Sequence, residues 1–113
     1  MRGLRPRRRV WAAPSEVEPG TGVATQLELM RKLVDGEVSG PDFSYAWLDA
    51  RRKTLNKGER VREKFERILD DVFYLLDEYV EDPALREPGD ITDEQLTEGV
   101  RDALERLSAL ERN

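Results

Sequence analysis

The side chains best suited to chemistry in this 113-residue chain are carboxylates, which are concentrated in less than a third of it. Between Glu66 and Glu98 there are twelve acidic residues against two basic ones, Arg67 and Arg86. Carboxylates serve as acids, bases or metal ligands, or they bind the cationic groups of a partner. We take ten residues of this stretch as the candidate binding surface: Asp70, Asp71, Tyr74, Asp77, Glu78, Glu81, Asp82, Asp90, Asp93 and Glu94.

A catalytic or metal-binding role for these carboxylates is disfavoured by the composition. The chain contains no His and no Cys, which removes the commonest general base, the commonest transition-metal ligand and the thiolate nucleophile. Neighbouring acids on a helix, such as Asp70 and Asp71, point about 100° apart and do not converge on one ion. We therefore predict no enzyme activity, no cofactor and no metal site.

The acidic residues coincide with the strongest apolar periodicity of the sequence, which predicts a helix over residues 59–80. Tyr74 departs from its apolar stripe, and we predict an exposed interface anchor there, the alternative being a half-buried residue at the stripe edge. The predicted buried stripe contains Val61, Phe65, Ile68, Val72, Leu76 and Tyr79. The predicted acidic outer face contains Glu59, Glu63, Glu66, Asp70, Asp77 and Glu81.

Three further helices are predicted by apolar spacing and capping signals. The first covers about residues 25–35 and ends at Gly36, and the second follows a Ser39 cap and runs to about residue 54. A Thr92–Gln95 capping box opens the fourth, after Asp82-Pro83 has stopped the third. The fold class is therefore all-α, and we predict an antiparallel four-helix bundle over residues 25–113.

Residues 1–24 are predicted to be a disordered basic arm outside this domain. They are rich in proline and glycine without an apolar period, and they hold five arginines within residues 1–9. Two interpretations stay open for the arginines, a nucleic-acid contact and an unstructured start. No apolar run is long enough for a secretory signal or a membrane span, so we expect a cytoplasmic protein with no membrane partner.

The acidic surface itself has two interpretations. It is either a solvated face that keeps a small protein soluble or a surface for a basic partner. Carboxylates closer than the Debye length of about 8 Å repel one another, and so large an excess of one sign costs stability. The excess favours a basic partner.

Two segments carry a family resemblance. Residues Leu29–Phe43 resemble the first helix and turn of the colicin D type immunity proteins, described as bacterial self-protective colicin-like immunity. The stronger match covers residues Asp77–Arg86 and continues through Asp90–Leu96. The resemblance spans about residues 27–110 and leaves out the arm.

The resemblance implies a non-enzymatic helical inhibitor that binds the nuclease domain of a tRNA-cleaving toxin. We expect acidic residues to cover the basic RNA-binding cleft of that ribonuclease, one monomer per toxin, without direct contact to nucleic acid. Among the candidate surface residues, Asp77 and Asp82 also match the family pattern. Two alternatives stay open: a helical interaction or oligomerisation module without a toxin partner, and an acidic nucleic-acid mimic directed at a DNA-binding protein.

Overall fold

The structure is a computed structural model that describes residues 10–79 and 83–112. Within these ranges it contains four α-helices, which confirms the predicted all-α class and the number of main helices. They are α1 (Gly22–Val34), α2 (Gly40–Asn56), α3 (Glu63–Glu78) and α4 (Asp93–Ala109). The smaller elements are β1 (Val10–Trp11), β2 (Arg60–Val61) and the 3-10 turns η1 (Pro14–Glu16), η2 (Pro83–Leu85) and η3 (Leu110–Arg112).

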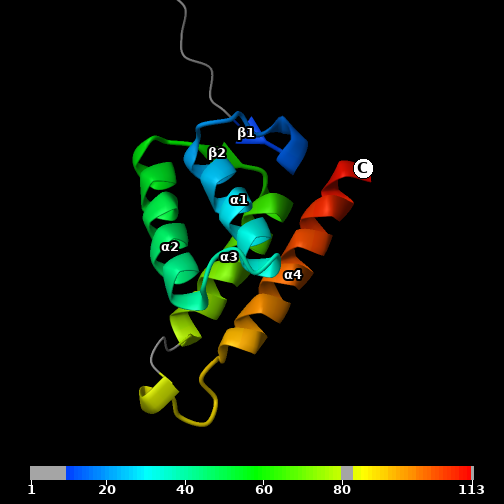
Figure 1. The fold of residues 1–113 in the computed structure, drawn as a ribbon. Helices are drawn as coiled ribbons and strands as arrows, with labels where there is room; N and C mark the ends of the chain where they lie inside the picture. Colours follow the sequence, from blue (N-terminus) through cyan, green and yellow to red (C-terminus); the bar gives the residue numbers. More distant parts are fainter. Residues whose placement is uncertain (1–9, 80–82, 113) are drawn as a thin grey trace, which may run out of the picture.

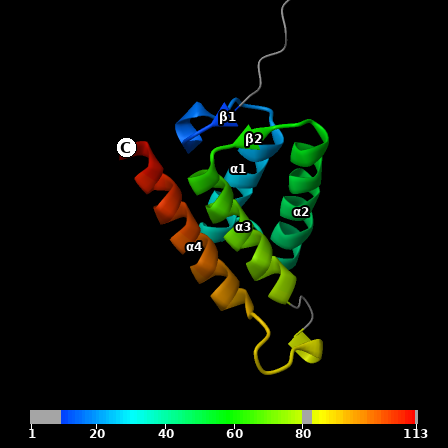
Figure 2. The same cartoon turned by 180° about the vertical axis from the view of Figure 1, so that it is seen from behind.

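The helices pack around one core. The principal helix contacts join α1 to α2, α3 to α4 and α1 to α4 (Figure 1). Seen from behind, α3 lies in front, between α2 and α4, with its outer side uncovered (Figure 2). Four helices around a shared core are thus observed, while their antiparallel bundle arrangement stays a prediction. The largest fully buried side chains are Trp47, Phe43, Phe65, Met30, Leu96 and Leu107.

The capping signals set most of the helix boundaries. Ser39 accepts a hydrogen bond from the backbone N–H of Asp42, and Thr92 with Gln95 forms the predicted capping box. Gly36 has a φ of 78°, a conformation that glycine adopts without strain, so the first helix ends where predicted. That helix begins at Gly22, three residues before the predicted start, because Thr21 caps it through the N–H of Ala24.

The prediction of a disordered arm over residues 1–24 is not confirmed for residues 10–24, and residues 1–9 lie outside the described part of the chain. β1 pairs in parallel with β2, and the N–H of Arg62 donates to the carbonyl of Trp11 at 2.8 Å. Trp11 is only 6% exposed and belongs to the core. Burial of the Trp11 ring and the pairing of two strands order a segment whose proline and glycine content predicted disorder.

The predicted third helix is shorter than expected, since it begins at Glu63 and ends at Glu78. Residues 60 and 61 are extended because they pair with β1, and Gly58 turns the chain with a φ of 69°. Placing Glu59 on the outer face was wrong: it lies before α3 and is 9% exposed. Its carboxylate accepts hydrogen bonds from the N–H groups of Gly22 and Val23, each at 3.0 Å.

Glu59 therefore closes the N-terminus of α1, where a negative charge meets the positive end of the helix dipole. Glu59→Ala leaves two amide groups without an acceptor and should lower the free energy of unfolding by about 2 kcal/mol, measured by urea denaturation. Glu63→Ala is the matched control, because its exposed pair with Arg67 should contribute about 0.5 kcal/mol or less. Equal stability of the two variants would contradict the assigned role.

Candidate functional site

The outer side of α3 carries half of the candidate residues. Burial of the helix's apolar stripe fixes which side faces outward, and the helical period then brings residues at steps of three, four and seven to that side. The buried stripe is Phe65, Ile68, Leu69, Val72 and Leu76. We call the opposite side the α3 acidic face and define it as Asp70, Asp71, Tyr74, Asp77 and Glu78.

Three carboxylates of the α3 acidic face have no cationic partner among the described residues. Asp71 accepts a hydrogen bond from Arg106 of α4 at 2.7 Å, which links the two helices at the surface. Asp70 is half-buried, while Asp77 and Glu78 are exposed. In the part of the chain that the structure describes, these three side chains form no hydrogen bond or ion pair, so their charge is available to a partner.

Tyr74 is 58% exposed, which confirms the prediction of an exposed side chain. Its ring contacts Phe73 edge to face, with ring centroids 5.8 Å apart. Phe73 is in turn covered by the guanidinium of Arg51 from α2, 4.2 Å from the ring centroid. The ring of Tyr74 therefore packs on Phe73, which Arg51 covers, and it has carboxylates of the same helix around it. An exposed ring supported in this way is suited to anchor an interface.

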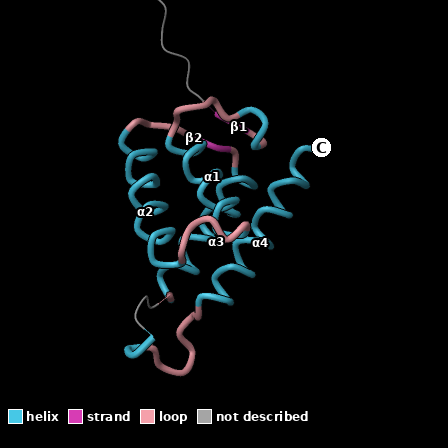
Figure 3. The backbone as a smooth tube through the Cα atoms, in the orientation of Figure 1, coloured by secondary structure: helices cyan, strands magenta, loops and turns pink. Residues whose placement is uncertain are grey.

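The remaining candidates belong to the connection between α3 and α4. Glu81 and Asp82 lie outside the described residues. Asp90 accepts a hydrogen bond from the N–H of Glu87 at 2.7 Å and so closes a turn of the connection. Glu94 is exposed on the first turn of α4, and no described residue pairs with it. Residues 83–92 project at the end of the molecule opposite the two strands (Figure 3).

Asp93 is held by an internal cluster. Its carboxylate accepts hydrogen bonds from the hydroxyl of Tyr79 and from the guanidinium of Arg86, the latter at 2.9 Å. The same guanidinium lies 5.5 Å from the centroid of the Tyr79 ring. Gly40, at the start of α2, approaches so closely that a Cβ there would overlap the Tyr79 hydroxyl. This Tyr79 cluster, made of Gly40, Tyr79, Arg86 and Asp93, joins the ends of three helices.

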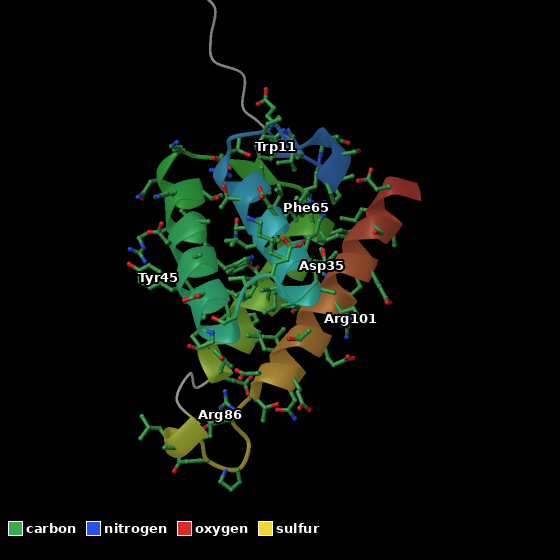
Figure 4. The ribbon with its side chains drawn as sticks, in the orientation of Figure 1. Trp11, Asp35, Tyr45, Phe65, Arg86 and Arg101 are labelled. Atoms are coloured by element: carbon green, nitrogen blue, oxygen red, sulfur yellow. The ribbon has the colours of Figure 1, made fainter. Side chains whose placement is uncertain are left out.

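The sequence placed Tyr79 in the buried stripe, where it lies, but did not identify its partner. A buried phenol needs a hydrogen-bond acceptor, and this need is the signal that could have pointed to a nearby carboxylate. Burial, reinforced by the hydrogen bond to Asp93, raises the pKa of Tyr79 above its ordinary value of 10.0. Arg86 belongs to this cluster, and Figure 4 labels it at the end of the molecule opposite Trp11.

The arrangement is suited to recognition through charge. In residues 10–79 and 83–112 no three His, Cys, Asp or Glu side chains are grouped so that they could hold a metal ion. The same residues include no helix that is long and apolar enough to cross a membrane. The α3 acidic face instead presents carboxylates without a cationic partner among the described residues, around the exposed ring of Tyr74.

A comparison with protein families matches residues 22–107 to the model of one family, described as bacterial self-protective colicin-like immunity. No curated protein and no solved structure matches the chain. The matched range contains α1 to α3 and nearly all of α4, and with them the α3 acidic face and the Tyr79 cluster.

The Tyr79 cluster predicts a specific pH dependence. Because the pKa of Tyr79 is raised in the folded state, the unfolded chain loses this proton first as the pH rises above 10.0. The stabilisation is complete below that pH and is lost above it. Tyr79→Phe should cost about 1 kcal/mol at neutral pH and should weaken the decline in unfolding free energy above pH 10.

Urea denaturation across this pH range measures both effects. Tyr45→Phe is the matched control, since Tyr45 is 78% exposed, and it should unfold like the wild type at neutral pH. Parallel stability curves for the wild type and Tyr79→Phe above pH 10 would show that the buried hydroxyl has no such role.

Proposed function

Because the chain belongs to the family of bacterial self-protective colicin-like immunity proteins, we propose that it neutralises a toxin whose active domain is a basic ribonuclease of the tRNA-cleaving type. Family membership implies a protein that neutralises a toxin. The ribonuclease target and the binding surface are our extension. The observation that carries this extension is the α3 acidic face, which exposes Asp77, Glu78 and Tyr74. Figure 2 shows that the outer side of α3 is not covered by another helix.

A ribonuclease must bind the phosphates of its substrate, so its cleft is lined with cationic side chains. Carboxylates bind the same arginine and lysine groups through charge-assisted hydrogen bonds. Asp70 and Asp77 lie two helical turns apart, about 10 Å along α3. A helix of this kind, laid across the cleft, occupies several phosphate sites at once and excludes the RNA.

The unpaired carboxylates differ in role from those that are bound internally. Asp70, Asp77, Glu78 and Glu94 have no cationic partner among the described residues, and we assign them the direct contacts. Asp90 and Asp93 hold the connection and the start of α4 in place. Asp71 is shared with Arg106, so its use by a toxin requires that pair to open. Glu81 and Asp82 remain predictions.

Charge and the aromatic ring act at different stages of binding. An acidic face accelerates encounter with a cationic partner and suppresses unsuitable partners. Tyr74 contributes after contact, when its exposed ring is removed from water in a pocket of the toxin. We propose that one monomer binds one toxin domain in the cytoplasm of the producing cell.

The test uses the basic C-terminal domain of a toxin-like protein encoded beside this chain, with tRNA as substrate. Cleavage should stop at an equimolar amount of the full-length chain. Asp70→Asn, Asp77→Asn and Glu78→Gln together should slow association about tenfold or more at low salt, because electrostatic steering is lost, and the difference should shrink at high salt. Stopped-flow kinetics measures the rates.

The matched control removes three exposed carboxylates elsewhere, with Asp35→Asn, Glu37→Gln and Glu105→Gln. It changes the net charge by the same amount and should leave the association rate close to that of the wild type. If both triple variants slow association equally, the overall charge is responsible and the α3 acidic face is not the binding surface.

Tyr74→Ala should weaken toxin binding by about 2 kcal/mol, roughly thirtyfold, mainly through faster dissociation. The free energy of unfolding should change by about 0.5 kcal/mol or less, because the side chain is largely exposed. Tyr45→Ala, on the surface of α2, is the control and should change neither quantity (Figure 4). Unaltered dissociation of Tyr74→Ala would remove Tyr74 from the interface.

A further inference from the structure

The end of the molecule that carries the two strands, opposite the α3–α4 connection (Figure 1), exposes a group of cationic side chains. Five exposed cationic side chains lie at the C-terminal part of α2, along β2 and at the start of α3. We call them the basic pole, which consists of Arg52, Lys57, Arg60, Arg62 and Lys64. None of them forms an ion pair or a side-chain hydrogen bond with a described residue.

Four carboxylates near the basic pole already have partners, whereas Glu66 and Asp70, which line the same hollow as Arg60, have none among the described residues. Glu59 is bound by the N-terminus of α1, Glu63 pairs with Arg67, and Asp49 pairs with Lys53. Glu16 accepts a hydrogen bond from the N–H of Ala12. The five cations of the basic pole outnumber these two unpaired carboxylates, so an excess of unpaired positive charge remains on this part of the surface.

We propose that the basic pole binds the phosphodiester backbone of nucleic acid. Three of its five residues are arginines, whose planar guanidinium groups bind phosphate oxygens in a bidentate manner. Arg60 and Arg62 are two positions apart on extended chain, about 6.6 Å, so both side chains point to the same side. Two neighbouring phosphates of an extended strand can thus be contacted together.

The net charge of −5 opposes such binding only if the charge is evenly spread. α3 has 16 residues and is about 24 Å long, which is roughly three Debye lengths at physiological salt. The carboxylates at its C-terminal end are therefore screened from a polyanion bound at its N-terminal end. In the sequence, the five arginines of residues 1–9 directly precede Val10, which pairs with Arg60 in the sheet.

Nucleic acid fits the basic pole better than a lipid surface. The cations are distributed over three elements, whereas a helix that binds a membrane has a continuous apolar face below its cationic residues. The large aromatic side chain at this end, Trp11, is buried and cannot insert into lipid. Val10 and Leu55 are exposed there but belong to different elements.

The test is fluorescence anisotropy of labelled single-stranded RNA and of duplex DNA with the full-length protein, without toxin, between about 50 and 200 mM salt. Both should bind, because the backbone is the ligand. Arg60→Gln, Arg62→Gln and Lys64→Gln together should reduce the slope of log affinity against log salt by about 2 for single-stranded RNA. A second variant, Arg52→Gln with Lys57→Gln, should reduce it by about 1.

The matched control carries Arg31→Gln, Lys32→Gln and Arg101→Gln, which remove the same charge away from the basic pole and should leave the slope unchanged. Equal loss in the control, or no binding of RNA and DNA at low salt, would overturn the proposal. So would binding to vesicles of anionic phospholipid without binding to nucleic acid.

Replacement of the five arginines of residues 1–9 by Gln completes the series. If that variant alone abolishes binding while the pole variants keep the wild-type slope, the pole is not the site.

Discussion

Burial of one side of α3 is the constraint on which the functional surface depends. The stripe from Phe65 to Leu76 places five apolar side chains in the core, each contributing roughly 1.5–3 kcal/mol. Repulsion between neighbouring carboxylates on an exposed helix costs only a few tenths of a kcal/mol per pair, up to about 0.5. Burial therefore exceeds repulsion, and the helix holds a row of like charges on its other side.

Carboxylates that look alike in the sequence have separate tasks in the fold. Glu59 and Asp93 are bound by backbone and side-chain donors and join elements that are distant in sequence. Asp77 and Glu78 have no such donors among the residues that the structure describes, so their charge is available to a partner. The Tyr79 cluster, to which Asp93 belongs, fixes the end of α3 against the start of α4.

Local signals in the sequence were sufficient for the four helices, the caps at Ser39 and Thr92, and the exposed ring of Tyr74. Contacts between distant residues were not predictable in this way. The helical period continues backward through Glu59, but a strand pair that depends on Trp11 makes that stretch extended. Likewise, the need of Tyr79 for an acceptor could be inferred, whereas its partner Asp93 is set by how the connection folds back.

The N-terminal segment also contacts the last turn of the chain. Ser15 donates two hydrogen bonds to the carboxylate of Glu111, across a sequence separation of 96 residues. During translation this contact cannot form until residue 111 has left the ribosome, and contacts of such separation close late in folding. This link between the N-terminal segment and η3 therefore forms later than the pairing of β1 with β2, which requires the chain only as far as Arg62.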